Sequence, residues 1–196
     1  MNLGELNQTV ILIVTDYLNE KIKENVVFYK NLYPDKKFDT IKLSKLLYSF
    51  VLNARVVESG HNVDVLFAYK LEKSELYFCN PNDVWDFGMT QDVSMKTEHG
   101  NLIVRSFFAD EEESCSMHFI NMFQMLCYDN SVDRIIMVAD NTELNFALEV
   151  RHKKLWERKS LFFFKDYHNS KISLPIKYVN IAYTIALALG LNSNEF

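Results

Sequence analysis

The chain has 196 residues and a formal net charge of −5, and 48% of its residues are hydrophobic and 14% aromatic. This length suits one domain with a full core, residues 1–196, and the apolar content excludes an intrinsically disordered chain. The negative net charge argues against a protein that coats nucleic acid through its overall charge. A local basic patch is still compatible with that net charge.

The spacing of cysteine and histidine excludes two further classes. Cys79, Cys115 and Cys127 include no Cys-x-x-Cys pair, and the five histidines include no His-Glu-x-x-His arrangement. We therefore expect reduced thiols, no disulfide framework and no zinc site. The first residues lack the basic start of a signal peptide, and the longest late apolar stretch is shorter than the ~20 residues that a membrane span needs. The sequence predicts a cytoplasmic protein with no membrane contact.

The first part of the chain predicts one buried strand and two helices. Val10–Val14 is a short run of aliphatic and β-branched residues, typical of a strand that is buried on both faces. A helix is expected from about Glu20 through Tyr33. A second helix is expected from Ile41 to Glu58, because its apolar residues recur at helical spacing and Ser59-Gly60 supplies a stop.

The middle of the chain is richer in strands. Asn62–Lys70 and Asn101–Phe108 have the composition of long strands, and Glu75–Cys79 is a candidate short one. The polar stretch between Asn80 and His99, which contains a proline and a glycine, is interpreted as a loop excursion or a small hairpin.

The last part of the chain alternates helix and strand. We expect a helix through Phe119–Leu126, a strand at Arg134–Val138, a helix that begins near Thr142, a strand at Leu161–Phe164 and a closing helix at Ile176–Leu189. This alternation predicts an α/β fold, a three-layer sandwich with a mainly parallel central sheet of about four or five strands. The strands Val10–Val14 and Arg134–Val138 are expected to be neighbours at its centre.

Acidic residues follow three of the predicted strands. They are Asp16 after the first strand, the run Asp110–Glu113 after the third, and Asp140 with Glu143 after Arg134–Val138. Loops that follow parallel strands share one edge of the sheet, where ligands of such folds bind. Carboxylates gathered there repel one another unless a cation or a basic neighbour is present. Ligands that are all oxygen atoms suit magnesium or manganese.

A structural interpretation of the same loops stays open. Asn141 or Thr142 would be a good N-cap for the helix that follows, and an acidic run before a helix interacts favourably with the helix dipole. The hypothesis of a site therefore depends on all three loops meeting at one edge.

Two segments resemble a known family. Val10–Asn19 (VILIVTDYLN) resembles the opening of NYN domains, a branch of the PIN-like nucleases, in which the first strand ends in an aspartate followed three positions later by an asparagine. Asp16 and Asn19 reproduce that pair. Ile135–Leu144 (IIMVADNTEL) resembles the same family's strand followed by Ser-Gly-Asp-Ser-Asp-Phe, with Asn141 on the first aspartate of that motif.

The resemblance implies a PIN-like fold and a ribonuclease that depends on magnesium or manganese. Asp16 and Glu143 would be its catalytic carboxylates, Asn19 would contact RNA, and the ion would activate water. The implied metal ligands are Asp16, Asp140, Glu143 and a carboxylate from the acidic run, Asp110 or Glu113.

A second hypothesis comes from positions that depart from the family. Asn141 is a neutral amide where the family has a carboxylate, and Cys115 or Ser116 stands where it has another, although a small shift would bring in Glu113. A site that lacks two anionic ligands has little charge with which to dehydrate magnesium. The domain would then be a binding or assembly module, with a protein partner or a second copy of itself as a homodimer.

One basic run stands out, between Arg151 and Lys159. It offers Arg151, Lys153, Lys154 and Arg158 for RNA phosphates, with Trp156 available to stack on a base. The alternative is the basic last turn of a helix with the tryptophan in the core. No glycine-rich phosphate loop is present, which excludes the common nucleotide-binding motifs.

Overall fold

The computed structural model describes most of the chain. The described residues are 5–55, 62–70, 75–83, 93–97, 100–108, 114–140, 158–166 and 176–191.

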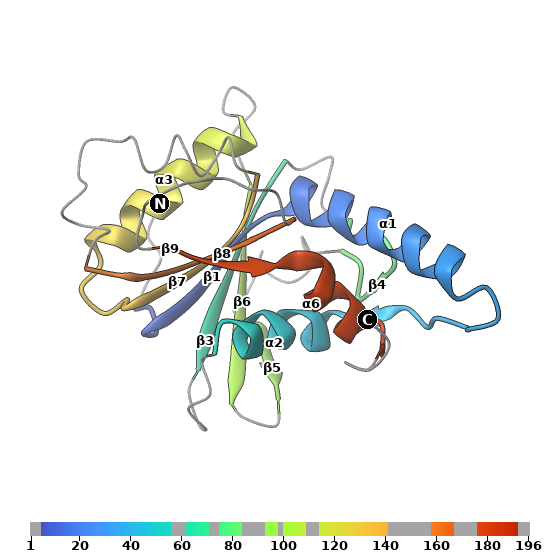
Figure 1. Ribbon diagram of the computed structural model, residues 1–196. Coiled ribbons are helices and arrows are strands. Elements are labelled where there is room, and N and C mark those ends of the chain that lie inside the picture. Colours follow the sequence, from blue (N-terminus) through green and yellow to red (C-terminus); the bar gives the residue numbers. More distant parts are fainter. Residues whose placement is uncertain are drawn as a thin grey trace.

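A seven-stranded sheet forms the middle layer, in the order β5-β6-β3-β1-β7-β8-β9 (Figure 1). All neighbouring pairs are parallel except β5 with β6. The strands are β1 (Thr9–Val14), β3 (Val63–Tyr69), β5 (Val93–Lys96), β6 (Asn101–Phe108), β7 (Arg134–Val138), β8 (Ser160–Lys165) and β9 (Ile176–Asn180). The predicted α/β class and mainly parallel sheet are confirmed, and the sheet is larger than predicted.

Helices cover both faces of the sheet, which gives three layers. Figure 1 shows α3 on one face and α1, α2 and α6 on the other. Their bounds are α1 (Thr15–Leu32), α2 (Leu43–Asn53), α3 (Cys115–Tyr128) and α6 (Ile181–Ala188). A two-stranded parallel sheet of β2 (Ile41–Lys42) and β4 (Cys79–Asn80) lies apart from the main one. No helix within the described ranges is long and apolar enough to cross a membrane.

The central pair of strands is β1 and β7, as predicted. They run side by side in parallel with Ile11 opposite Ile136. Every residue of β1 is buried, and its side chains alternate between the two cores. Ile11 and Ile13 face α1, α2 and α6, whereas Leu12 faces α3. Burial on both faces explains why these strands read as continuous apolar runs.

Several predicted boundaries are wrong. The first helix begins at Thr15, directly after β1, and not near Glu20. The predicted closing helix Ile176–Leu189 is a strand, β9, followed by the shorter α6. The side-chain oxygen of Asn180 separates the two, since it caps α6 by accepting from the backbone N–H of Ala182 at 2.9 Å.

Other boundaries differ by less. Within the described residues, α2 covers 43–53 of the predicted 41–58. Of the candidate strand Glu75–Cys79, only Cys79 joins a strand, β4. The hairpin interpretation of the polar excursion is confirmed in part, because β5 pairs antiparallel with β6. The helix predicted near Thr142 lies outside the described residues.

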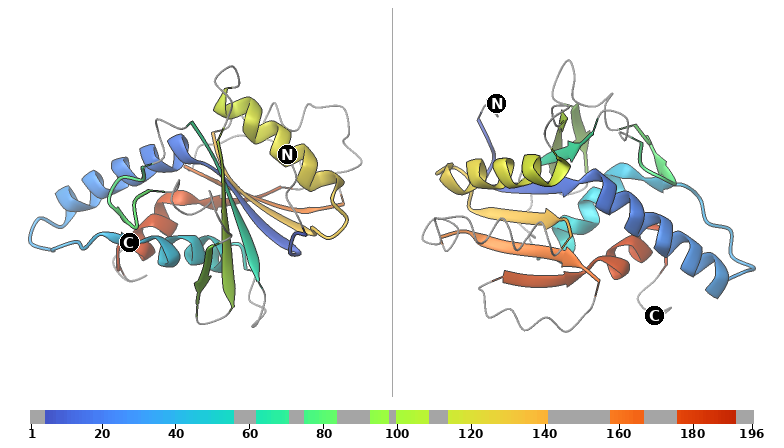
Figure 2. Two further views of the ribbon diagram at one scale, coloured as in Figure 1. Left: turned by 180° about the vertical axis from the view of Figure 1, so that it is seen from behind. Right: turned by 90° about the horizontal axis from the view of Figure 1, so that it is seen from above.

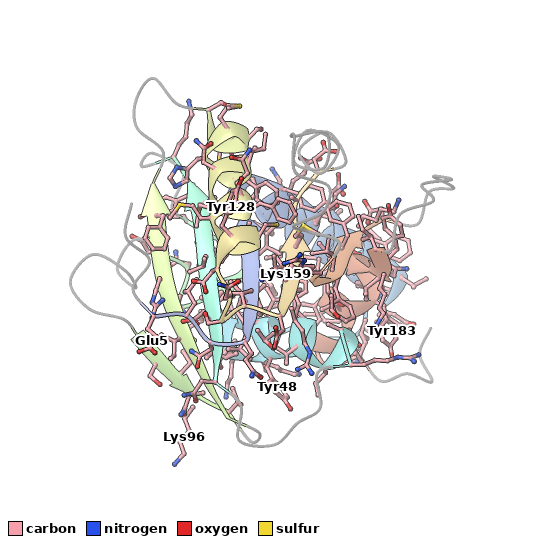
Figure 3. All side chains as sticks on the ribbon, turned by 90° about the vertical axis from the view of Figure 1, so that its left-hand side faces the viewer. Glu5, Tyr48, Lys96, Tyr128, Lys159 and Tyr183 are labelled. Carbon is pink, nitrogen blue, oxygen red and sulfur yellow. The ribbon has the colours of Figure 1, made fainter. Side chains whose placement is uncertain are left out.

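A buried ion pair anchors the segment before β1. Asp64, on β3, is fully buried and its Oδ2 accepts from the backbone N–H of Asn7 at 2.6 Å and from its Nδ2 at 2.9 Å. The Nη1 of Arg105, on β6, lies 3.4 Å from the other carboxylate oxygen. The Nη2 of Arg105 donates to the backbone oxygen of Glu5, which Figure 3 labels. This carboxylate joins two strands to the N-terminal segment.

Candidate site at the carboxyl edge of the sheet

The strand order reverses between β1 and β7. The chain goes from β1 outward to β3 and β6, then returns through α3 to β7 on the other side of β1 and continues to β8 and β9. In open α/β sheets the crevice at the carboxyl ends of the strands, beside such a reversal, is the usual ligand site. Figure 2 (right) shows β7, β8 and β9 side by side, with α1 beginning next to the ends of these strands.

Acidic side chains follow three adjacent strands at this edge. Asp16 is the second residue of α1, directly after β1, and it is partly buried. Asp140 follows β7 and is exposed. Asp166 follows β8. The predicted placement of Asp16 and Asp140 at one edge is therefore confirmed, and Asp166 is an acidic residue of this edge that the sequence analysis did not select.

A lysine ammonium group lies across these strand ends. Lys21 extends from α1 and its Nζ is 2.8 Å from the Oδ2 of Asp166 and 2.8 Å from the Oε2 of Glu24. This contact links α1, which follows β1, to the carboxyl end of β8, two strands away in the sheet. The Lys21 side chain is only 13% exposed. Burial alone would lower the pKa of Lys21, but the hydrogen bonds to Asp166 and Glu24 outweigh burial and raise it.

Tyr17 stands within electrostatic reach of the same groups. Burial raises the pKa of the Tyr17 hydroxyl, the negative charge of Asp166 and that of Asp140 raise it further, and Lys21 opposes them. The Lys21 Nζ lies 5.6 Å from the centre of the tyrosine ring, a cation–π distance. These effects favour the neutral phenol, which is a hydrogen-bond donor.

Asn19 has a structural contact at this edge. Its side-chain oxygen accepts from the backbone N–H of Tyr77, which fastens the segment around residue 77 to α1. The predicted contact of Asn19 with RNA would therefore use its side-chain amide nitrogen.

The remaining predicted site residues divide between described and undescribed parts of the chain. Arg158 is described and exposed. Lys159 beside it is structural, because its Nζ donates to the backbone oxygens of Asp129 and Val132 after α3 (Figure 3). Outside the described residues lie the acidic positions Asp110, Glu113 and Glu143, the neutral Asn141, and the basic Arg151, Lys153 and Lys154.

Only two of the implied metal ligands, Asp16 and Asp140, lie in the part of the chain that the structure describes. Among the described residues, no three His, Cys, Asp or Glu side chains form a group that could hold a metal ion. Asp166, the third carboxylate of this edge, is already bound to an ammonium group. The described groups can instead bind, through a neutral phenol, an ammonium group and carboxylates.

Asp166 and Lys21 were not selected from the sequence, although the sequence carries a signal for each. Asp166 follows a buried aromatic run in the same way that Asp16 and Asp140 follow their strands. Lys21 lies four positions after Tyr17, so the two side chains share one face of a helix. Nothing in the sequence, however, pairs Lys21 with Asp166, because the parallel sheet alone brings them together.

Comparison with known proteins places the chain in one family. Residues 4–196 match the model of a family of unknown function, DUF6621, and since the match covers nearly the whole chain, the protein belongs to that family. No curated protein gives a significant match to the chain. The same is true of the solved structures.

Proposed function

We propose that this member of the DUF6621 family is a PIN-like domain that uses the carboxyl edge of its sheet without a resident metal, as a binding or assembly module. The observation that carries the proposal is the position of Lys21. Carboxylates gathered at one edge need a positive charge nearby, and here the chain supplies its own ammonium group within 2.8 Å of Asp166.

The ammonium group of Lys21 changes which ligands can bind at this edge. A divalent cation placed beside Asp166 would meet the charge of Lys21, and like charges repel strongly in a partly buried site. A hydrogen-bonding ligand meets no such cost. Lys21 and the protonated Tyr17 are donors, and Asp16 and Asp140 lie on the neighbouring strand ends. This combination favours recognition of a polar partner over hydrolysis.

Exposed apolar side chains support the assembly part of the proposal. Val27, Phe28 and Leu32, near the end of α1, are 49%, 57% and 53% exposed. Large apolar side chains that share one stretch of a surface helix are typical of protein contact surfaces. A protein partner or a second copy of the chain fits this surface.

A divalent-metal-dependent ribonuclease is the second candidate. The observation that favours it is the adjacency of Asp16 and Asp140 at the point where the strand order reverses, with the rest of the implied ligands on residues outside the described ranges. The two candidates differ in whether Asp16 supports a chemical step.

A cleavage assay separates the candidates. We expect no cleavage of single-stranded or hairpin RNA by the purified full chain with manganese present, because the ammonium group of Lys21 occupies the edge. Gel analysis of end-labelled RNA is the measurement. Cleavage that Asp16→Asn abolishes and Asp39→Asn retains would establish the ribonuclease and refute the module. Asp39 is a matched control because it is exposed and lies between α1 and β2, away from the edge.

A further inference from the structure

A second region of the molecule has the features of a ligand site. A cavity of about 680 Å³ lies on the sheet face that α1, α2 and α6 cover, between the end of α2 and the strands β7, β8 and β9. Arg134 and Ser160, the first residues of β7 and β8, line it. They lie at the amino ends of these strands, whereas Val179 and Asn180, which also line the cavity, lie at the carboxyl end of β9. The groups described at the carboxyl edge, Asp16, Tyr17, Lys21, Asp140 and Asp166, are not among the residues that line it.

The described lining of this cavity is strongly basic. It includes Arg55, Arg134 and Lys177, and no acidic residue is among the described residues that line it. The whole chain carries a formal net charge of −5, so three cations gathered around one hollow differ from the average surface. The polar side chains of Asn53 and Ser160 add hydrogen-bonding groups. Such a lining favours an anionic ligand.

The Lys177 ammonium group is held over an aromatic ring. Its Nζ lies 4.9 Å from the centre of the Phe162 ring, and Phe162, which is only 6% exposed, also lines the cavity. A cation–π contact of this kind limits where the ammonium group can go without neutralising it. Lys177 thus places its ammonium group at the cavity wall.

Arg55 occupies a backbone conformation that arginine seldom adopts. Its φ is +57°, in the left-handed region, two residues after the end of α2. Glycine or asparagine is the usual residue at this position after a helix, because a Cβ is strained there. The helix dipole stabilises a cation near the end of a helix. It would stabilise a lysine or arginine one turn earlier to the same extent, without a strained backbone at that residue. Strained residues of this kind cluster at ligand sites.

The charge of the lining and the volume of the cavity indicate which class of ligand fits it. A phosphate monoester carries about −1.5 to −2 charges at neutral pH, which matches several cations better than a single carboxylate does. Arginine side chains bind phosphate through paired N–H groups. A volume of about 680 Å³ falls within the range of small-molecule sites and holds a ligand of nucleotide size.

We propose that this cavity binds a phosphorylated small molecule, with Arg55, Arg134 and Lys177 as the residues that recognise its phosphate group. The site does not depend on the function proposed for the carboxyl edge, since no residue is shared between the two.

Calorimetric titration of the full chain at low salt tests the proposal, with adenosine monophosphate and inorganic phosphate as probes and adenosine as the uncharged control. We expect the two phosphates to bind and adenosine not to bind. Lys177→Gln and Arg55→Gly should each weaken binding by about tenfold or more, the loss typical of a hydrogen bond to a charged group. Lys37→Gln, a change at an exposed lysine between α1 and β2, should leave binding unchanged.

Arg55→Gly separates loss of binding from loss of folding. Because glycine relieves the strain at a positive φ, this variant should melt about 2–4 °C higher than the original chain while binding more weakly. The proposal is overturned if neither phosphate binds, if adenosine binds as tightly as its monophosphate, or if both variants bind like the original chain. Tighter binding of an oligoribonucleotide without terminal phosphates, at these same residues, would also overturn it in favour of an extended nucleic-acid ligand.

Discussion

Replacing Asp64 with alanine is expected to destabilise the fold by about 3–5 kcal/mol, the cost of breaking a buried ion pair by removing one partner. Asp64 is fully buried and accepts two hydrogen bonds from Asn7 while it faces Arg105. The alanine variant leaves the Arg105 side chain, which is 12% exposed, without this carboxylate, and it releases the segment before β1. Since native domains are stable by only about 5–15 kcal/mol, the variant should lie near the limit of folding.

Urea denaturation measures this cost. Asp39→Ala, a change at an exposed carboxylate, serves as the control and should stay within about 0.5 kcal/mol of the original chain. A double-mutant cycle with Arg105→Ala should give a clear coupling energy, because the two residues are in contact. If Asp64→Ala is as stable as the control, Asp64 does not anchor the N-terminal segment.

Replacing Phe164 with alanine is expected to cost about 3–5 kcal/mol, the range for removing a buried aromatic side chain. Phe164, on β8, is fully buried and meets Phe50, on α2, edge to face with ring centroids 4.8 Å apart. Thermal or urea unfolding tests this expectation.

Met117→Ala, on α3, is the control for that change. Met117 is 50% exposed, so its loss should alter stability by about 0.5 kcal/mol or less. The cycle of Phe50→Ala with Phe164→Ala should show a coupling of about 0.5–1.5 kcal/mol, as found for aromatic pairs. Equal costs for Met117→Ala and Phe164→Ala would contradict the assigned packing of α2 on β8.

The fold class could be predicted because the central strands are buried on both faces. Burial leaves continuous apolar runs in β1 and β7, and such runs are visible in a sequence. The two edge strands were harder to recognise: β5 was expected only as part of a possible small hairpin, and β9 was predicted as the start of a helix. β5 alternates apolar and polar residues inside a polar stretch, and β9 continues directly into the apolar α6. Only the cap formed by Asn180 separates the strand from the helix there.

The candidate site could be predicted in part. Asp16 and Asp140 were identifiable because each directly follows a recognisable strand, and strand ends meet at one edge of a parallel sheet. The contact between Lys21 and Asp166 could not be predicted, since it depends on β8 lying two strands away from β1 and on α1 beginning at Thr15. Carboxylates that follow adjacent parallel strands predict a cation or a basic neighbour beside them, and Lys21 is such a neighbour of Asp166.

The basic cavity could not be predicted either, because it also depends on how distant parts of the chain are arranged. Arg55, Arg134 and Lys177 are far apart in the chain and none belongs to a cationic run. The end of α2 and the starts of β7 and β9 bring them together. The basic run that the sequence does display, Arg151–Lys159, includes Lys159, whose described contacts are with backbone oxygens near the end of α3.

Calorimetric titration with manganese, on the original chain and on Asp16→Asn, tests most directly the claim that the carboxyl edge works without a metal. The account predicts no tight binding to either protein, because Lys21 already supplies the positive charge that this edge needs. Tight binding to the original chain that Asp16→Asn abolishes and Asp39→Asn preserves would contradict the account.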